Sequence, residues 1–169
     1  MKCRTKTRSN AKHANRQNNV EPHPDFADVN LPRDAVVGAF HLTPLSPEFV
    51  DEDLAAVQAT APLMNGIFGD WPAGLTREYN AVDLAWHERE FTARRSFSWI
   101  LRDPDGSYIG CFYLFPELGS RGQAKATFWL CDLPDRATVA ANLKAELGAW
   151  LTTVLPPGIA LTWVTRPVI

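Results

Sequence analysis

The chain has 169 residues, of which 46% are hydrophobic and 21% are charged. This length fits one domain with a substantial core and leaves little room for two. No apolar run approaches the ~20 residues that span a bilayer, and no short apolar segment follows the basic start, so we expect neither a membrane anchor nor a secretory signal. The cysteines Cys3, Cys111 and Cys131 lack metal-ligand spacing, which favours a reduced, cytoplasmic protein without a metal site.

Charge is distributed unevenly along the chain. Residues 1–20 hold six of the 17 basic side chains and no acid, so their net charge is +6. The remaining residues hold 11 basic and all 19 acidic side chains, so their net charge is −8. A basic segment with few apolar residues buries too little surface to offset its ordering entropy, so we expect disorder there. Basic arms can bind nucleic acid or anionic membranes. The acidic remainder repels the same polyanions, which favours a solvated tail or a start codon placed too far upstream.

Residues 21–34, with Pro22, Pro24 and Pro32, are expected to form an extended linker. The folded domain is expected over 35–169. The elements predicted within it are a strand over 36–42, helices over 47–61 and 77–95, strands over 97–102, 108–115 and 125–131, a helix over 136–154 and a strand over 159–165.

Local signals define several of these elements. Ser46-Pro47-Glu48 is a helix start, with a cap residue, a proline in the first turn and an acid near the positive end of the dipole. Asp103-Pro104-Asp105-Gly106 indicates a hairpin turn, because proline presets the first turn angle and glycine accepts a positive φ. Gly119-Ser120-Arg121-Gly122 looks like a phosphate loop, but no helix follows it, so we predict a second connection between strands.

Several motifs support a family resemblance. They are Trp71-Pro72, Thr76-Arg77-Glu78-Tyr79-Asn80, Asp83-Leu84-Ala85-Trp86-His87, the 103–106 turn followed by Ile109-Gly110-Cys111-Phe112-Tyr113, and Phe128-Trp129-Leu130. With the element order β-α-α-β-β-β-α-β over 35–165, the chain resembles the GNAT superfamily of acyl-CoA N-acyltransferases, especially short bacterial members that end soon after the fifth strand. The resemblance implies an α/β (α+β) fold with a mixed, mostly antiparallel sheet flanked by helices.

The resemblance also implies a co-substrate, acetyl-CoA or another acyl-CoA. In that family the pantetheine arm lies in a gap between the strands expected here at 125–131 and 159–165, against the backbone of Phe128, Trp129, Leu130 and Cys131. The pyrophosphate binds N–H groups at the next helix start, in a loop patterned Arg/Gln-x-x-Gly-x-Gly/Ala whose glycines allow close backbone approach.

This sequence has no glycine in the corresponding loop. Ungapped, the motif covers 135–140 in one register and 136–141 in the next, so the implied pyrophosphate contacts are Arg136, Ala137, Thr138, Val139, Ala140 and Ala141. Asp132 and Asp135 add negative charge beside them, although an aspartate is also a favoured helix cap.

The acceptor side of the implied site has weaker candidates. His87 could act as a base near neutral pH, or it could be a surface or packing residue. Glu117 could reach the same cleft or be a solvated loop acid. Phe68 and Trp71 could form a wall of the acceptor pocket or pack under their loop. Cys131 is interpreted as a small, half-buried side chain rather than a nucleophile.

The leading functional hypothesis is transfer of an acyl group from acyl-CoA to an unidentified amine, on a small molecule or a peptide. The alternative is a non-catalytic GNAT-fold ligand-binding or assembly protein that has lost CoA binding; association with nucleic acid through residues 1–20 ranks third. Longer family members continue through another helix and two strands. The apolar strand over 159–165 is therefore expected at an exposed edge, which favours a homodimer formed by strand pairing.

Overall fold

The computed structural model describes residues 21–64 and 68–164. The predicted basic tail and the end of the predicted last strand lie outside these residues. The elements are β1 (Ala35–Val37), β2 (Phe40–Pro44), a short 3-10 helix η1 (Pro47–Phe49), α1 (Val50–Met64), α2 (Arg77–Thr92), β3 (Phe97–Arg102), β4 (Tyr108–Pro116), β5 (Gln123–Leu130), α3 (Arg136–Val154) and β6 (Ala160–Trp163).

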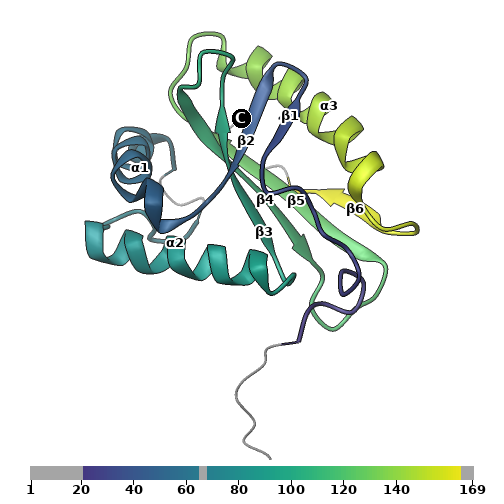
Figure 1. Cartoon of the computed structure of the whole chain (residues 1–169). Coiled ribbons are helices and arrows are strands. Elements are labelled where there is room, and N and C mark those ends of the chain that lie inside the picture. Colours follow the sequence, from purple (N-terminus) through teal and green to yellow (C-terminus); the bar gives the residue numbers. More distant parts are fainter. Residues whose placement is uncertain (1–20, 65–67, 165–169) are drawn as a thin grey trace, which may run out of the picture.

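One sheet organises the molecule, with its strands in the order β1-β2-β3-β4-β5-β6. Every neighbouring pair is antiparallel except β5 and β6, which run parallel and are connected through α3. Figure 1 shows α1 and α2 on one side of the sheet and α3 on the other. The predicted mixed, mostly antiparallel sheet flanked by helices is confirmed.

Two apolar cores form because successive strand residues point to opposite faces. On β4, Phe112 and Leu114 face α3 and belong to the larger core, while Cys111 faces α1 and α2 and belongs to the smaller one. On β5, Phe128 and Leu130 likewise pack on the α3 side, and Trp129 packs on the other. This alternation places the side chains of adjacent β5 residues in different environments.

The first predicted strand is in fact a hairpin. β1 and β2 pair antiparallel around Gly38, which has a φ of 58°. A Cβ at Gly38 would lie 2.5 Å from the end of the exposed Glu146 side chain of α3, which is free to rotate away, so this turn needs glycine for its dihedral angle. The predicted helix over 77–95 is also shorter, because α2 ends at Thr92 and Arg94 takes a left-handed conformation.

Residues 21–34 were expected to be a linker, and this expectation is wrong. Phe26 is fully buried against Phe97, with ring centroids 5.3 Å apart, and Leu31 is buried in the same core. The Gly122 N–H donates to Asp25 Oδ2 at 2.7 Å. A composition rich in proline and aspartate indicated a solvated segment, but one large apolar side chain and a carboxylate that accepts a backbone N–H fix it to the domain.

Candidate active site

Within the described residues, β6 pairs with only the first half of β5. Pairing runs from Gln123 opposite Ala160 to Ala126 opposite Trp163, and the Val164 N–H donates to the Ala126 carbonyl at 2.8 Å. In the part of the chain that the structure describes, β6 pairs with no residue of β5 beyond Ala126. β5 itself continues to Leu130, so among the described residues the edge of β5 over 127–130 has no partner strand on the β6 side, and we call this unpaired edge the opening.

Backbone groups of β5 face this opening. The Cys131 N–H donates to the Ile109 carbonyl of the neighbouring strand at 2.8 Å. Since the direction of backbone N–H and C=O groups alternates along a strand, those of Phe128 and Leu130 point away from β4 and toward the opening. The opening therefore presents the backbone donors and acceptors of β5, which an extended amide-containing arm can pair with.

The N-terminus of α3 lies at the end of β5. Asp135 precedes the helix in a left-handed conformation, with φ 53° and ψ 30°, and its side chain caps no helix N–H. The N–H groups of Thr138 and Val139 both donate to the Asp135 carbonyl. A helix leaves the N–H groups of its first residues without an intrahelical partner, and here these belong to Arg136 and Ala137.

Arg136 connects this helix start to the opening. Its Nη2 donates to the Leu130 carbonyl at 2.9 Å, and its Nε is buried with no hydrogen-bond partner among the described residues. Burial lowers the pKa of the guanidinium, and the nearby Asp132 partly offsets that effect. The arginine that the motif assigned to a pyrophosphate thus lies over the last backbone carbonyl of β5.

A cavity of about 290 Å³ lies on the α1–α2 side of the sheet. It is lined by Phe68, Trp71, Asp83, His87, Tyr113, Phe115 and Thr127. The Thr127 hydroxyl donates to the Val164 carbonyl at 3.1 Å, next to the last described β5–β6 pair. The cavity therefore adjoins the opening, and it unites three predicted site residues: His87, Phe68 and Trp71.

His87 contributes the titratable ring of this cavity. Its Nδ1 lies 2.9 Å from Ser98 Oγ of β3, and its Nε2 lies 3.7 Å from Asp83 Oδ2, one helical turn earlier. Burial lowers the pKa of His87, while the charges of Asp83 and Glu90 act in the opposite direction. The imidazole is therefore neutral near pH 7, and when Nδ1–H donates to Ser98 the Nε2 lone pair is free to accept a proton.

Tyr113 forms the wall opposite His87, with ring centroids 5.5 Å apart. Its hydroxyl oxygen accepts a hydrogen bond from Trp129 Nε1 at 3.2 Å, and burial raises the pKa of the phenol. The hydroxyl therefore keeps its proton. Sequence reasoning missed Tyr113, Phe115, Asp83 and Thr127 as site residues. The i, i+4 spacing of Asp83 and His87 on one helix face was a signal that could have revealed the pair.

Glu117 does not line this cavity. It lines an adjoining cavity of about 500 Å³ that shares Phe115, and its carboxylate lies 2.6 Å from Lys125 Nζ. The smaller cavity is the candidate site, because it contains His87 and includes Thr127 at the unpaired edge of β5.

The remaining predicted cofactor residues fall into separate environments. The side chains of Phe128, Trp129 and Leu130 are buried in the two cores. Cys131 is half-buried and burial raises the pKa of its thiol, which disfavours the thiolate. On α3, Ala137, Thr138 and Ala141 are exposed, Val139 is half-buried and Ala140 is buried against the sheet. Of this helix, only Arg136 and Ala137 combine a position at the opening with available N–H groups.

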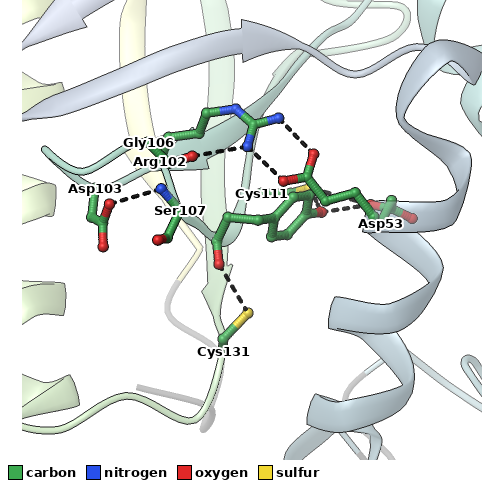
Figure 2. Close-up of polar contacts among 9 residues, drawn as sticks. Asp53, Arg102, Asp103, Gly106, Ser107, Cys111 and Cys131 are labelled. Atoms are coloured by element: carbon green, nitrogen blue, oxygen red, sulfur yellow. Dashed lines mark hydrogen bonds and ion pairs between the residues drawn. The ribbon is translucent and has the colours of Figure 1, made fainter.

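A buried polar cluster fixes α1 and α2 to the sheet next to the cavity. The Asp53 carboxylate of α1 accepts hydrogen bonds from the Tyr108 hydroxyl at 2.5 Å and from Asn80 Nδ2 at 2.8 Å. Burial raises the pKa of Asp53. Figure 2 shows Asp53 beside Cys111, with Arg102 nearby. Asn80 precedes His87 by two turns of α2, so the cluster helps to hold the helix that carries the histidine.

Within 21–64 and 68–164, no three His, Cys, Asp or Glu side chains come together as a metal site. No helix in these ranges is long and apolar enough to cross a membrane.

Comparison with known proteins gives a consistent fold. No protein-family model and no curated protein sequence matches this chain. Solved structures do match. An acetyltransferase from Salmonella typhimurium that modifies the N-terminal serine of ribosomal protein L7/L12 aligns with a TM-score of 0.60 at 9% identity, covering 75% of this chain and 70% of that one. The Microcin C7 self-immunity acetyltransferase MccE, solved with acetyl-CoA and AMP, aligns with a TM-score of 0.59 at 12% identity, over 75% and 71% of the two chains.

A third match is an acetyltransferase from Thermus thermophilus, with a TM-score of 0.56 at 16% identity over 78% of this chain and 79% of that one. At these identities the similarity concerns the fold. The architecture is the one that these acetyltransferases share, with a helix N-terminus directly after β5. More specifically, the chain has the GNAT fold that the sequence motifs predicted.

Proposed function

We propose that this protein transfers an acyl group from acyl-CoA to an amine, in the cavity that contains His87. One observation carries the proposal. The cavity adjoins the unpaired edge of β5, through Thr127 and its bond to Val164. A neutral base, an acid that can stabilise it and an opening for an extended arm therefore occur together.

The residues of the opening fit the chemistry of CoA. The backbone groups of Phe128 and Leu130 suit the amides of pantetheine. The N–H groups of Arg136 and Ala137, at the positive end of α3, suit an anion such as the pyrophosphate. The unpartnered Nε of Arg136 is a further donor. Acyl-CoA supplies a thioester, whose carbonyl carbon an amine can attack.

The protein's own residues have three tasks in this scheme. His87 Nε2 accepts a proton from the amine as the new C–N bond forms. Asp83, 3.7 Å from that nitrogen, stabilises the imidazolium that results. The Tyr113 hydroxyl keeps its proton, because its oxygen accepts from Trp129 and its pKa is raised, so it can donate toward negative charge that develops in the cavity.

One observation favours a second candidate, a GNAT-fold binding or assembly protein without CoA. The Arg136 side chain bonds to the Leu130 carbonyl, and Asp132 and Asp135 place negative charge beside the helix start. Both features oppose an anionic cofactor unless Arg136 moves. A homodimer through the edge strand β6, a cytoplasmic location and a solvated basic segment over 1–20 remain predictions.

Calorimetry with acetyl-CoA tests the proposal. We expect micromolar binding that Arg136→Glu abolishes, because the variant replaces the one cation at the mouth of the described opening with a third acid. Lys144→Glu is the matched control, since it makes the same charge change further along α3, where Lys144 lies over the Trp163 ring. Absence of binding at millimolar acetyl-CoA would reject the transferase and favour the binding protein. If acetyl-CoA does bind, release of the free CoA thiol in the presence of an amine mixture would establish catalysis.

A further inference from the structure

The cavity that contains His87 has aromatic walls. Four of its lining side chains are phenyl, phenol or indole rings: Phe68, Trp71, Tyr113 and Phe115. Two of them, Phe68 and Trp71, form a perpendicular pair with centroids 5.4 Å apart and an interplanar angle of 85°. Tyr113 and Phe115 form a nearly parallel pair at 5.9 Å, with an angle of 6°. The rings thus come from two separate elements, the loop before α2 and strand β4.

The same cavity carries one negative charge. Asp83 is its only acid among the described lining residues, none of which is Lys or Arg. The Asp83 side chain is 49% exposed, so its carboxylate borders both the cavity and the solvent. His87 adds no positive charge near pH 7, because burial lowers its pKa more than Asp83 and Glu90 raise it. Tyr113 and Ser98, which face His87 from the sheet, are uncharged.

Aromatic faces and a carboxylate attract the same kind of ligand. The face of an aromatic ring carries negative potential and binds organic cations, most strongly where the site is shielded from water. A neutral or anionic group gains nothing from Asp83 and loses its hydration. The cavity holds about 290 Å³ and shares Phe115 with the neighbouring cavity of about 500 Å³, which leaves room for a substituent on the cation.

We propose that the cavity binds its acceptor as an organic ammonium ion, held between the two aromatic pairs with its charge toward Asp83. The identification of this ligand as the acceptor rests on the proposed acyl transfer, whereas the binding itself requires no CoA. The bound ammonium first loses one proton to the solvent through His87 Nε2 and becomes a free amine. Its lone pair then forms the C–N bond as the C–S bond breaks, and a second proton passes from the nitrogen to His87 Nε2 and on to the departing thiolate.

The test uses a cation that cannot be acylated. Tetramethylammonium and its neutral counterpart tert-butanol are titrated into the protein without CoA, and the indole N–H resonance of Trp71 is followed by NMR; in the Trp71→Leu variant the reporter is the indole N–H of Trp129, which donates to Tyr113. We expect tetramethylammonium to bind and shift this resonance, and tert-butanol to have no effect. Asp83→Asn and Trp71→Leu are each expected to weaken binding about fivefold or more. Asp105→Asn, in the exposed turn before β4, is the matched control and leaves binding unchanged.

The outcomes separate this inference from the proposed function. Equal binding of the two probes, or binding that Asp83→Asn and Trp71→Leu leave unchanged, overturns the ammonium site. Acyl transfer to amines with a KM that neither substitution changes also overturns the ammonium site, but it supports the proposed acyl transfer. Cation binding without any acyl transfer from acetyl-CoA supports the site and rejects the transferase. Since Asp83 is half-exposed, its amide variant is expected to fold.

Discussion

His87 has two different polar neighbours, and each restricts a different property of the ring. Ser98 lies at Nδ1 and fixes the orientation of the imidazole, while Asp83 lies near Nε2 and favours the protonated form. Burial opposes protonation and dominates, so the pKa of His87 is lowered. A base with this balance is neutral before the reaction and is stabilised once it has accepted a proton.

This balance predicts the pH dependence of catalysis. Because the pKa of His87 is lowered, kcat/KM should fall only as the pH decreases below the ordinary histidine range. Asp83→Asn removes a charge that raises this pKa, so the acidic limb should move to still lower pH, together with a lower plateau. The pH profile of kcat/KM measures both effects.

His41→Gln on the exposed face of β2 is the control and should leave the profile unchanged. An acidic limb that Asp83→Asn does not move, or moves upward, would contradict the assignment of His87 as the base.

The sequence could reveal individual site residues only where their chemistry is unusual. His87, Phe68 and Trp71 were candidates because of their side-chain chemistry and place in the family layout, although each also had an interpretation as a surface or packing residue. Tyr113 and Phe115 were read as ordinary strand residues, since aromatic residues on alternate strand positions are typical of any core. Only the tertiary arrangement shows that this face of β4 borders a cavity rather than a packed interior.

Among the connecting elements, the loop before α3 is the main departure from a CoA-binding pattern. Asp135 takes the left-handed conformation that glycine adopts at no steric penalty, and its carbonyl accepts from Thr138 and Val139. The backbone of this loop therefore has a conformation suited to glycine, although the loop itself contains no glycine. The side chain contributes a negative charge beside the positive end of the helix without capping it.

Substitution of Asp135 should strengthen acetyl-CoA binding. Asp135→Asn keeps a residue that tolerates the left-handed conformation and removes only the charge, so we expect about 2- to 5-fold tighter binding, equivalent to ~0.3–1 kcal/mol. Asp135→Gly should match or exceed that gain, because it also relieves the backbone. Calorimetry measures both.

Asp28→Asn, a substitution in the N-terminal segment away from this loop, is the control. Unchanged or weaker binding in both Asp135 variants would show that the anion does not approach this helix start.

Regular elements were predicted well where period and boundary signals agree. The helix over 136–154 and the strand over 97–102 have the predicted limits, because apolar spacing and flanking turn residues indicate the same ends. The hairpin of β1 and β2 was missed, since Gly38 was its sole turn signal inside a short apolar run. The gap between β5 and β6 that the family resemblance implies stays a prediction, because nothing in a strand sequence specifies where a neighbour stops pairing.

For the molecule as a whole, the N-terminal segment over 21–34 completes the larger core. Phe26→Ala should therefore destabilise the protein by ~3–5 kcal/mol, the usual effect of removing a fully buried phenyl ring. This is a large part of the ~5–15 kcal/mol that stabilises a typical domain. Chemical denaturation measures the change. Val36→Ala, at a side chain that is 66% exposed, is the control and should change stability little.

A loss below ~1 kcal/mol for Phe26→Ala would mean that the segment is an appendage, as its composition first indicated. The segment was misread because proline and aspartate content describes local preference, whereas its attachment depends on partners such as Phe97 and Gly122 that are distant in sequence, a relation that local patterns do not encode.

The same attachment sets the order of events during synthesis on the ribosome. Asp25 is made early, yet its partner Gly122 follows 97 residues later. At roughly 5–20 residues per second, the segment waits on the order of 5–20 s before its docking surface exists. During that interval Phe26 is exposed to chaperones and to neighbouring nascent chains. Completion of the larger core is therefore a late step, which begins only after the β4–β5 turn has left the exit tunnel.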